Sequence, residues 1–307
     1  MRVAIIGRTE ILFDTAVALE KMGSKIACVI TSKEAPEYSR TAEDFRVLAD
    51  QLGVPFAQGL PIVSHIDLLK MSQADIAVSI NYTGVIPQEV IDIFPLGILN
   101  AHGGDLPRYR GNACQAWAIL NGESRIGLCI HRMIGGELDS GDIVARSYMP
   151  IDQNTKVTAV WKWMNEATPD LMLDAVAKLA ADPQYVLERQ SKDQAHALRC
   201  YPRRPEDGRI DWSRSALEIL RLINACNRPY AGAFCEFEGR KTIIWDAELV
   251  DDGEAFLAIP GQVTLVLQDS IEVACGAGKL RVRRIQLDGD AECSPAQRIT
   301  SVRKRLT

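Results

Sequence analysis

Two short stretches of the chain carry side chains that together could perform acyl transfer. Asn100 and His102 lie in the run Leu99–Gly111, and Asp139 follows 37 residues after His102. An amide can hold an acyl oxygen, an imidazole can stabilise the oxyanion that develops there, and a carboxylate can orient the imidazole and help remove a proton from an incoming nitrogen. Alternatively, Asn100 and His102 only cap a turn after a strand. We favour the first interpretation, which predicts a site that moves an acyl group onto an amine.

The two stretches resemble the family of enzymes that transfer formyl from N10-formyltetrahydrofolate. That family carries Asn-x-His-x-x-x-Leu-Pro-x-x-Arg-Gly and, further along the chain, Leu-Asp-x-Gly. Here the pattern is read at Asn100, His102, Leu106-Pro107, Arg110-Gly111 and Leu138-Asp139-Ser140-Gly141. The resemblance is strong over residues 75–145 and weaker after residue 200. Motifs in this order and spacing are specific to that family.

The resemblance implies a role for each residue of the motifs. Asn100 would hydrogen-bond the formyl oxygen, His102 would stabilise the oxyanion, and Asp139 would hold His102 and help accept the amine proton. N10-formyltetrahydrofolate would be the formyl donor, and no metal would be needed. Residues expected to contact the folate are Ile80, Tyr82, Gly84, Ile86, Gly135 and Leu138, and residues expected to contact the acceptor are Arg110 and Gly111. For His131, a supporting role and a purely structural one are equally open.

The first half of the chain alternates strand-like and helix-like segments. Strands are expected near residues 3–7, 25–31, 74–80 and 97–100, with helices at 12–23 and 43–52 between them. This pattern predicts an open, mainly parallel, doubly wound α/β sheet, which binds ligands beyond the carboxyl ends of its strands. Asn100 ends one such strand. Gly7 begins no G-x-G-x-x-G motif, so a nicotinamide cofactor is not expected.

The second half indicates a separate, smaller domain. A helix is expected over residues 156–181, interrupted at Pro169, and a polar, proline-dotted linker over 186–205. One helix and five short strands then predict a small β-rich open barrel. We therefore expect a catalytic folate-binding domain at 1–185, a linker at 186–205 and a C-terminal domain at 206–307. The run Arg204–Trp212 resembles the start of the C-terminal domain in methionyl-tRNA and aminoarabinose-type formyltransferases.

Composition limits the class of protein. The chain has 307 residues, of which 47% are hydrophobic and 24% charged, values typical of soluble globular proteins. It contains no apolar run of the roughly 18 residues that a membrane helix needs, and no signal-peptide pattern. Its eight cysteines form no C-x-x-C pair and only four histidines accompany them, so zinc is not expected. A cytoplasmic location is expected, and Cys114 is interpreted as a buried, inert thiol.

The acceptor amine is the least determined part of the prediction. Methionyl-tRNA formyltransferases have a basic insertion near residues 35–45, but here residues 35–44 hold one arginine and three acids, and the net charge is −5. We therefore expect a small-molecule acceptor, a nucleotide-linked amino sugar. Methionyl-tRNA is the first alternative, and a small amine such as hydroxyornithine or a carrier-bound amino acid is the second. A folate-binding sensor without catalysis is a further alternative, and the oligomeric state is left open.

Overall fold

The computed structural model describes residues 1–307, apart from the side chain of Gln194, and the chain divides into two compact units. The units are interleaved in sequence. The first comprises Met1–Cys114, Ile126–Met149 and Trp161–Cys200, and the second comprises Gln115–Arg125, Pro150–Val160 and Tyr201–Thr307. The domains expected from the sequence, 1–185 and 206–307, are each one continuous segment, whereas the two units are each made of three. The expected domain boundaries stay a prediction.

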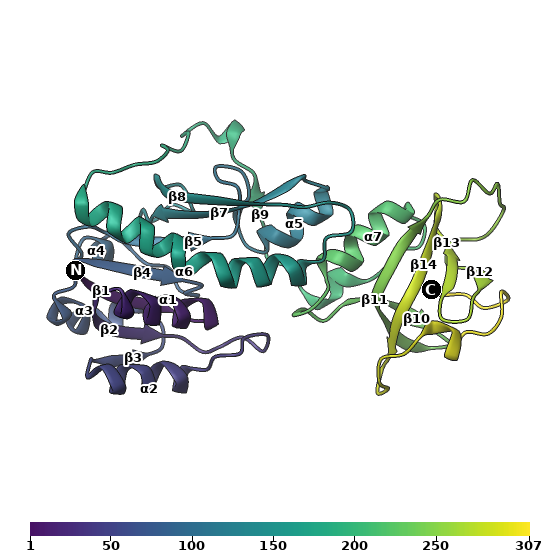
Figure 1. Ribbon diagram of the computed structural model, residues 1–307, viewed down its shortest axis with the longest axis horizontal. Coiled ribbons are helices and arrows are strands. Elements are labelled where there is room, and N and C mark those ends of the chain that lie inside the picture. Colours follow the sequence, from purple (N-terminus) through teal and green to yellow (C-terminus); the bar gives the residue numbers. More distant parts are fainter. The chain divides into compact units, whose positions relative to one another are not determined.

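The first unit is built on a seven-stranded sheet with the order β3-β2-β1-β4-β5-β7-β8 (Figure 1). The pairs from β3 to β5 are parallel, whereas β7 runs antiparallel to β5. The open, mainly parallel sheet expected from the sequence is therefore confirmed. Its strands are β1 (Arg2–Gly7), β2 (Lys25–Thr31), β3 (Phe56–Gln58), β4 (Ile76–Ile80), β5 (Ile98–His102), β7 (Arg125–Arg132) and β8 (Ile143–Pro150). A second, two-stranded sheet joins β6 (Arg110–Gly111) to β9 (Arg199–Cys200).

Both faces of the large sheet are buried. Ala4 and Ile6 of β1 belong to one core with Leu69 and Phe94, so the alternate residues of β1 face the other side, where α1 contacts β1, β2 and β4. In Figure 1, α1 and α6 lie over the same region of the sheet, and Nε1 of Trp161 in α6 donates to Oε1 of Glu10 in α1 at 3.2 Å. The helices up to residue 181 are α1 (Glu10–Lys21), α2 (Ala42–Leu52), α3 (Ile66–Ser72), α4 (Gln88–Ile91), α5 (Cys114–Asn121) and α6 (Val157–Ala181), with short 3₁₀ turns at Ile62–His65 and Gln194–His196. Of these, α5 from Gln115 onward and the first turn of α6 belong to the second unit.

The glycine that ends β1 has a packing explanation. A Cβ on Gly7 would lie 2.0 Å from the carbonyl oxygen of Ile80, at the end of β4. The backbone N–H of Arg8 donates to that same oxygen at 3.0 Å. Gly7 therefore allows two strand ends to approach each other closely.

Helix α6 corrects one expectation. It runs unbroken through Pro169, so the predicted interruption there is wrong. A proline inside a helix costs about 3 kcal/mol because it removes a hydrogen bond and crowds the preceding turn. Met164, five residues before the proline, and Met172, three residues after it, are buried, and burial of one such side chain is worth about 1.5–3 kcal/mol. Burial of the helix on both sides of the proline offsets the local cost.

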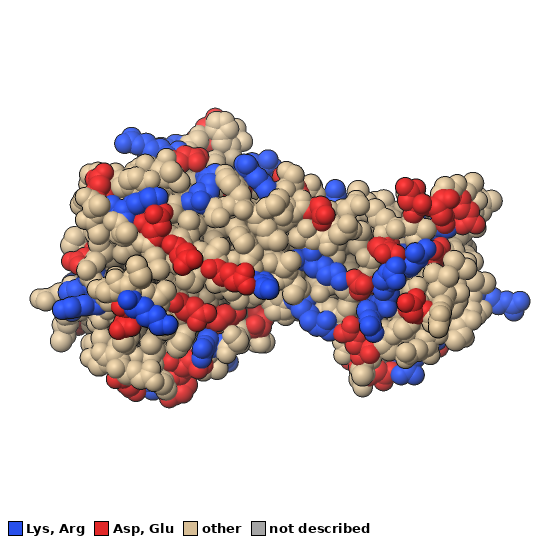
Figure 2. Space-filling model, viewed as in Figure 1, with Lys and Arg blue, Asp and Glu red and all other residues tan. Residues whose placement is uncertain are grey.

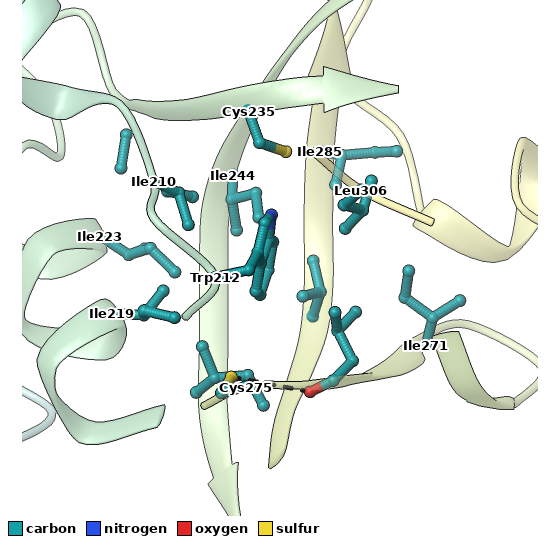
Figure 3. Close-up of a cluster of buried hydrophobic side chains, with 14 of the residues drawn as sticks. Ile210, Trp212, Ile219, Ile223, Cys235, Ile244, Ile271, Cys275, Ile285 and Leu306 are labelled. Atoms are coloured by element: carbon teal, nitrogen blue, oxygen red, sulfur yellow. Dashed lines mark hydrogen bonds between the residues drawn. The ribbon is translucent and has the colours of Figure 1, made fainter. Parts of the chain in front are cut away.

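The second unit contains a five-stranded antiparallel sheet with the order β10-β11-β14-β13-β12. Its elements are α7 (Ala216–Ala225), β10 (Ala233–Phe237), β11 (Arg240–Val250), β12 (Val263–Val266), β13 (Ile271–Ala274) and β14 (Lys279–Leu287), with 3₁₀ turns at Pro205–Gly208 and Pro295–Gln297. Figure 3 shows its core, in which Trp212, Ile219 of α7 and Ile244 of β11 are buried together. The expected small β-rich domain is confirmed. No helix in the described part of the chain is long and apolar enough to cross a membrane.

Candidate active site

Strand β5 presents the first two motif residues on one side of the sheet. Asn100 and His102 are two residues apart in β5, so their side chains point to the same face. The strand continues through His102 rather than ending at Asn100, which places the imidazole at the carboxyl end of β5. The Asp139 carboxylate reaches this point from the loop between β7 and β8, and its Oδ2 lies 3.5 Å from Nδ1 of His102. The structure thus brings Asn100, His102 and Asp139 together.

The Asp139 carboxylate is held by three groups. The backbone N–H of Gly111 donates to Oδ2 at 2.8 Å, the His102 ring faces Oδ2, and Nε2 of His131 lies 3.5 Å from Oδ1. Only 13% of the Asp139 side chain is exposed. Burial by itself would raise the pKa of Asp139, but His102, His131 and the Gly111 amide together hold that pKa well below its usual range. Asp139 is therefore an ionised carboxylate at neutral pH.

The His102 ring lies between two acceptor oxygens. Its Nδ1 faces Asp139, and its Nε2 lies 2.6 Å from the carbonyl oxygen of Tyr109. A neutral imidazole has one N–H, whereas the doubly protonated ring donates at both nitrogens. The ring is therefore oriented by Asp139 at Nδ1 and by the Tyr109 carbonyl at Nε2.

The glycine at position 104 leaves room for this ring. A Cβ on Gly104 would lie 2.6 Å from Nε2 of His102 and 2.3 Å from the carbonyl oxygen of Tyr109. Both distances are shorter than real Cβ contacts. The close approach of the His102 ring and of the Tyr109 carbonyl therefore leaves no room for a side chain at position 104.

His131 lies directly across from Asn100 in the β5–β7 pair. Nδ2 of Asn100 is 3.2 Å from Nε2 of His131, and the other ring nitrogen, Nδ1, is 2.9 Å from the carbonyl oxygen of Arg132. Because a carbonyl only accepts, Nδ1 carries a proton, and the Asn100 N–H points to the other ring nitrogen, Nε2. The structure thus gives His131 a contact with the asparagine. The sequence left this choice open, because a lone histidine in an apolar strand does not reveal its cross-strand neighbour.

Cys114 lies beside the site in a form unsuited to nucleophilic attack. Its side chain is buried, and Sγ contacts the Tyr109 carbonyl at 2.9 Å and lies 3.7 Å from Nε2 of His102. A hydrogen bond with Cys200, together with burial, raises the pKa of the Cys114 thiol. A protonated, buried thiol agrees with the inert role expected for Cys114.

The residues expected to contact folate lie on two loops that touch each other. Gln88 of α4 accepts a hydrogen bond from the backbone N–H of Gly135 at 2.8 Å, which ties the segment after β4 to the loop before Asp139. Ile80 and Ile86 are buried, so only their backbone could meet a ligand. Tyr82 donates to the carbonyl oxygen of Gly59, and burial raises its pKa to about 12.

The side chains that do reach the surface here are apolar. Leu138 is 38% exposed, and Val85 and Ile134 on the same two loops are 79% and 39% exposed. The sequence analysis missed Val85 and Ile134, because an apolar residue does not reveal whether it is buried. Gly84 packs closely, since a Cβ there would lie 2.8 Å from Leu60 and 2.9 Å from Tyr82. These exposed side chains give the two loops an apolar surface, and Leu138 directly precedes Asp139.

The two expected acceptor residues support the Asp139 loop in this structure. Arg110 is buried, and its Nη2 donates to Oε1 of Gln190 at 2.9 Å. Gly111 donates its N–H to Asp139, and a Cβ on Gly111 would lie 2.3 Å from the carbonyl oxygen of Cys200. Their part in binding the acceptor stays a prediction. Gln190 was missed because it lies in a stretch that resembles a linker by composition.

Comparison with known families agrees with this geometry. The formyl transferase family matches residues 1–176, and the formyl transferase C-terminal domain matches residues 203–303. The chain belongs to the formyltransferase family. Its two units thus correspond in the main to the two domains of that family, and the cluster of Asn100, His102 and Asp139 lies in the N-terminal one.

Two kinds of formyltransferase are similar to this one. The methionyl-tRNA formyltransferase of Citrifermentans bemidjiense is 29% identical over 296 residues, which is 94% of this chain and 90% of the relative. Among solved structures, the N-formyltransferase of Helicobacter canadensis, in complex with folinic acid and dTDP-3-aminofucose, has a TM-score of 0.69 at 15% identity and covers 92% of this chain and 98% of its own. The sugar 3N-formyltransferase WlaRD has a TM-score of 0.68 at 17% identity, and the match covers 95% of this chain and 99% of WlaRD. At these identities the structural likeness establishes the fold.

Proposed function

We propose that this formyltransferase transfers formyl from N10-formyltetrahydrofolate to the primary amine of a nucleotide-linked amino sugar. The chemistry rests on one observation, the grouping of Asn100, His102 and Asp139 at the carboxyl end of β5. The acceptor nitrogen attacks the formyl carbon, the C=O becomes a tetrahedral oxyanion, and the C–N10 bond then breaks. The amine gives up one proton and N10 gains one, so the reaction consumes no proton overall.

Each residue of the cluster has a distinct part in these steps. Asn100 donates an N–H to the formyl oxygen, and His102 stabilises the oxyanion as it forms. Removal of one such donor typically costs about 2.7–4 kcal/mol of transition-state stabilisation. Asp139 orients the His102 ring and lies where it can relay the amine proton. Its depressed pKa makes it a weak proton acceptor and suits it better to the first task.

The folate would lie on the apolar surface next to Asp139. Backbone groups of residues 80–86 and of Gly135 can hydrogen-bond the edge of the pterin. Val85, Ile134 and Leu138 offer exposed apolar area for the flat ring system. A folate bound there would hold its formyl carbon beside the cluster, since Leu138 directly precedes Asp139.

The choice of acceptor rests on the loop between β2 and α2. Residues 33–44 contain two basic and four acidic side chains. The Arg40 guanidinium pairs with Asp44 at 3.3 Å, and Arg8, next to the loop, donates to the carbonyl oxygens of Lys33 at 2.6 Å and Asn81 at 3.2 Å. Both arginines are therefore engaged within the protein. Because binding of RNA depends on Lys and Arg contacts with phosphates, this loop is poorly suited to a tRNA.

The surface of the second unit supports the same choice. Figure 2 shows lysines and arginines of this unit beside acidic side chains on the visible face. Arg281 and Arg283 of β14 both pair with Glu248 of β11 at 3.2 and 2.7 Å. The similarity in fold to sugar formyltransferases, over nearly their whole length, agrees with an amino sugar as acceptor.

Methionyl-tRNA is the second candidate, favoured by the names of the relatives in sequence. The relative described above carries that name at 29% identity over nearly the full chain. The two candidates differ in the charge that the acceptor presents. A tRNA would require many phosphate contacts and would bind much more weakly as salt rises, whereas a nucleotide-linked sugar needs few.

A direct competition between acceptors tests the proposal. The purified enzyme receives N10-formyltetrahydrofolate with a labelled formyl group, together with dTDP- and UDP-linked amino sugars and methionyl-tRNA at equal concentration. Label on an amino sugar, with little on methionyl-tRNA at physiological salt, is expected. Label on methionyl-tRNA alone would overturn the acceptor assignment and leave the chemistry intact. His102→Ala, assayed in parallel, shows the background.

A further inference from the structure

Gln190 is a buried polar residue in a segment that the sequence presents as a linker. The segment follows α6 and returns to the first sheet, where the backbone of Ile143 pairs with that of Glu188 through N–H to O distances of 2.9 and 3.1 Å. Only 8% of Gln190 is exposed. A buried amide costs free energy unless it is hydrogen-bonded, so its partners indicate what it does.

The Gln190 amide uses its donors and its acceptor on the elements that frame the Asp139 carboxylate. Its Nε2 donates to the carbonyl oxygen of Asp139 at 2.9 Å and to that of Gly141 at 2.7 Å. Its Oε1 accepts from Nη2 of Arg110 at 2.9 Å. Arg110 precedes Gly111, whose N–H binds the Asp139 carboxylate. One side chain thus connects the two backbone segments that place this carboxylate.

The Asp139 loop needs such support because its backbone is strained. Asp139 has φ +47°, a left-handed conformation that costs roughly 1–2 kcal/mol for a residue with a Cβ. Such conformations persist only where the surroundings enforce them. Gly141 packs so tightly that a Cβ would lie 1.9 Å from the carbonyl oxygen of Arg132. The Gln190 amide holds the carbonyl oxygens on both sides of this turn.

We propose that Gln190 is a positioning residue for formyl transfer, which sets the Asp139 carboxylate against His102 by fixing the backbone of the 139–141 turn. The inference rests on the proposed role of Asp139 in the mechanism. Gln190 touches none of the three residues of the cluster through their side chains, so it acts through the backbone of Asp139 and through Arg110.

The substitutions Gln190→Ala and Gln190→Glu separate positioning from simple space filling. Alanine removes all three hydrogen bonds. Glutamate has almost the same shape and keeps the contact with Arg110, now as an ion pair, but it turns an acceptor oxygen toward the carbonyl oxygens of Asp139 and Gly141. If Gln190 only fills space, glutamate restores activity. If its donors fix the turn, glutamate does not.

Steady-state kinetics and NMR on the full-length protein test the proposal. Because a misplacement of about 1 Å can cost about 10²-fold in rate, kcat is expected to fall about 30- to 100-fold in both variants, with KM for N10-formyltetrahydrofolate changed less than about threefold. Gln184→Ala, an exposed glutamine of the same segment, is the matched control and keeps wild-type kcat. A wild-type kcat in Gln190→Glu would overturn the proposal. A loss of kcat in either variant that equals its fraction of unfolded protein would overturn it as well.

The NMR measurement is independent of the acceptor. The ¹⁵N shifts of the His102 ring report its tautomer and its contact with Asp139. They are expected to change in both Gln190 variants and to stay as in the wild type in Gln184→Ala. If neither acceptor is formylated by the wild type but these shifts move, the proposed acceptors fail and the positioning role stands. Unchanged shifts in a folded Gln190→Glu protein would overturn it.

Discussion

Nδ2 of Asn100 lies 3.2 Å from Nε2 of His131, its direct neighbour across the β5–β7 pair. The contact fixes which way the Asn100 amide points, so one N–H is occupied by His131 and the other is free to be aimed at a formyl oxygen. His131 is 98% buried, so the contact lies away from water. Without His131, the Asn100 amide would lose a hydrogen bond that water does not readily replace there.

His131→Ala is therefore expected to lower kcat about 2- to 12-fold, since a single hydrogen bond is worth about 0.5–1.5 kcal/mol. Steady-state kinetics of formyl transfer measure this loss. His196→Ala is the control, because His196 is exposed and contacts Ser191 away from the cluster. Equal kcat values for the two variants would show that the Asn100–His131 contact has no part in catalysis.

Asp139→Asn tests the carboxylate with almost no change of shape. The variant keeps the contact with the Gly111 N–H through its side-chain oxygen but loses the charge opposite His102. We expect kcat to fall by about two to three orders of magnitude, within the range that positioned acid–base groups contribute. Binding of folate, measured by calorimetry, is expected to stay within a few-fold of the wild type. Turnover near the wild-type value would exclude Asp139 from the mechanism.

The low pKa of Asp139 also predicts how stability depends on pH. The pKa of Asp139 is lower in the folded protein than the value of about 3.9 that an unfolded chain has. The ionised carboxylate therefore stabilises the fold above about pH 4, and this contribution is lost as the pH falls below that value toward the folded pKa. Thermal unfolding between pH 7 and pH 3 is expected to show a steeper loss of stability for the wild type than for Asp139→Asn. Parallel curves would contradict the assignment.

Gly104→Ala tests the space that the His102 ring occupies. The added methyl would lie 2.6 Å from Nε2 of His102 and 2.3 Å from the carbonyl oxygen of Tyr109. The ring or the backbone has to move, so kcat is expected to fall by at least 10-fold, in line with the sensitivity of catalysis to small displacements. Kinetics at a temperature where the variant is fully folded by circular dichroism measure the effect. Unchanged kcat would show that the ring tolerates displacement.

Limited proteolysis tests the boundary between the domains. The expected linker at 186–205 is anchored at Glu188 and Gln190 and at the β9 residues 199–200, so it is not uniformly free. Cleavage is expected first within 191–198 or 201–206, where most residues are exposed. Mass spectrometry of the early fragments locates the cuts. Early cleavage elsewhere, for example inside β11, would refute the proposed boundary.

Much of the fold was predictable because it follows from local patterns. The apolar runs of β1, β2 and β4 and the glycine after α2 identify buried parallel strands and a helix end. The Asn, His and Asp of the motifs were identifiable because their spacing is specific. Pro169 misled the prediction, because packing on both sides of a proline is not visible in the sequence.

The contacts that support the site could not be predicted in the same way. The pairing of Asn100 with His131 depends on strand register, and the three hydrogen bonds of Gln190 join segments about 50 and 80 residues apart. From composition, Gln190 is predicted to lie in a polar linker. It is buried because the neighbouring Glu188 pairs with Ile143 of β8, which brings this segment back against the sheet. Interactions of this long range appear only once the fold is known.

Transfer of labelled formyl in a single turnover tests the central claim most directly. Wild-type enzyme, His102→Gln and Asp139→Asn are each saturated with N10-formyltetrahydrofolate carrying labelled formyl and mixed with the acceptor that the wild type uses. We expect rapid appearance of labelled amide with the wild type, and transfer at least 100-fold slower with both variants, while donor binding is retained. Transfer at the wild-type rate by either variant would contradict catalysis by the Asn100, His102 and Asp139 cluster.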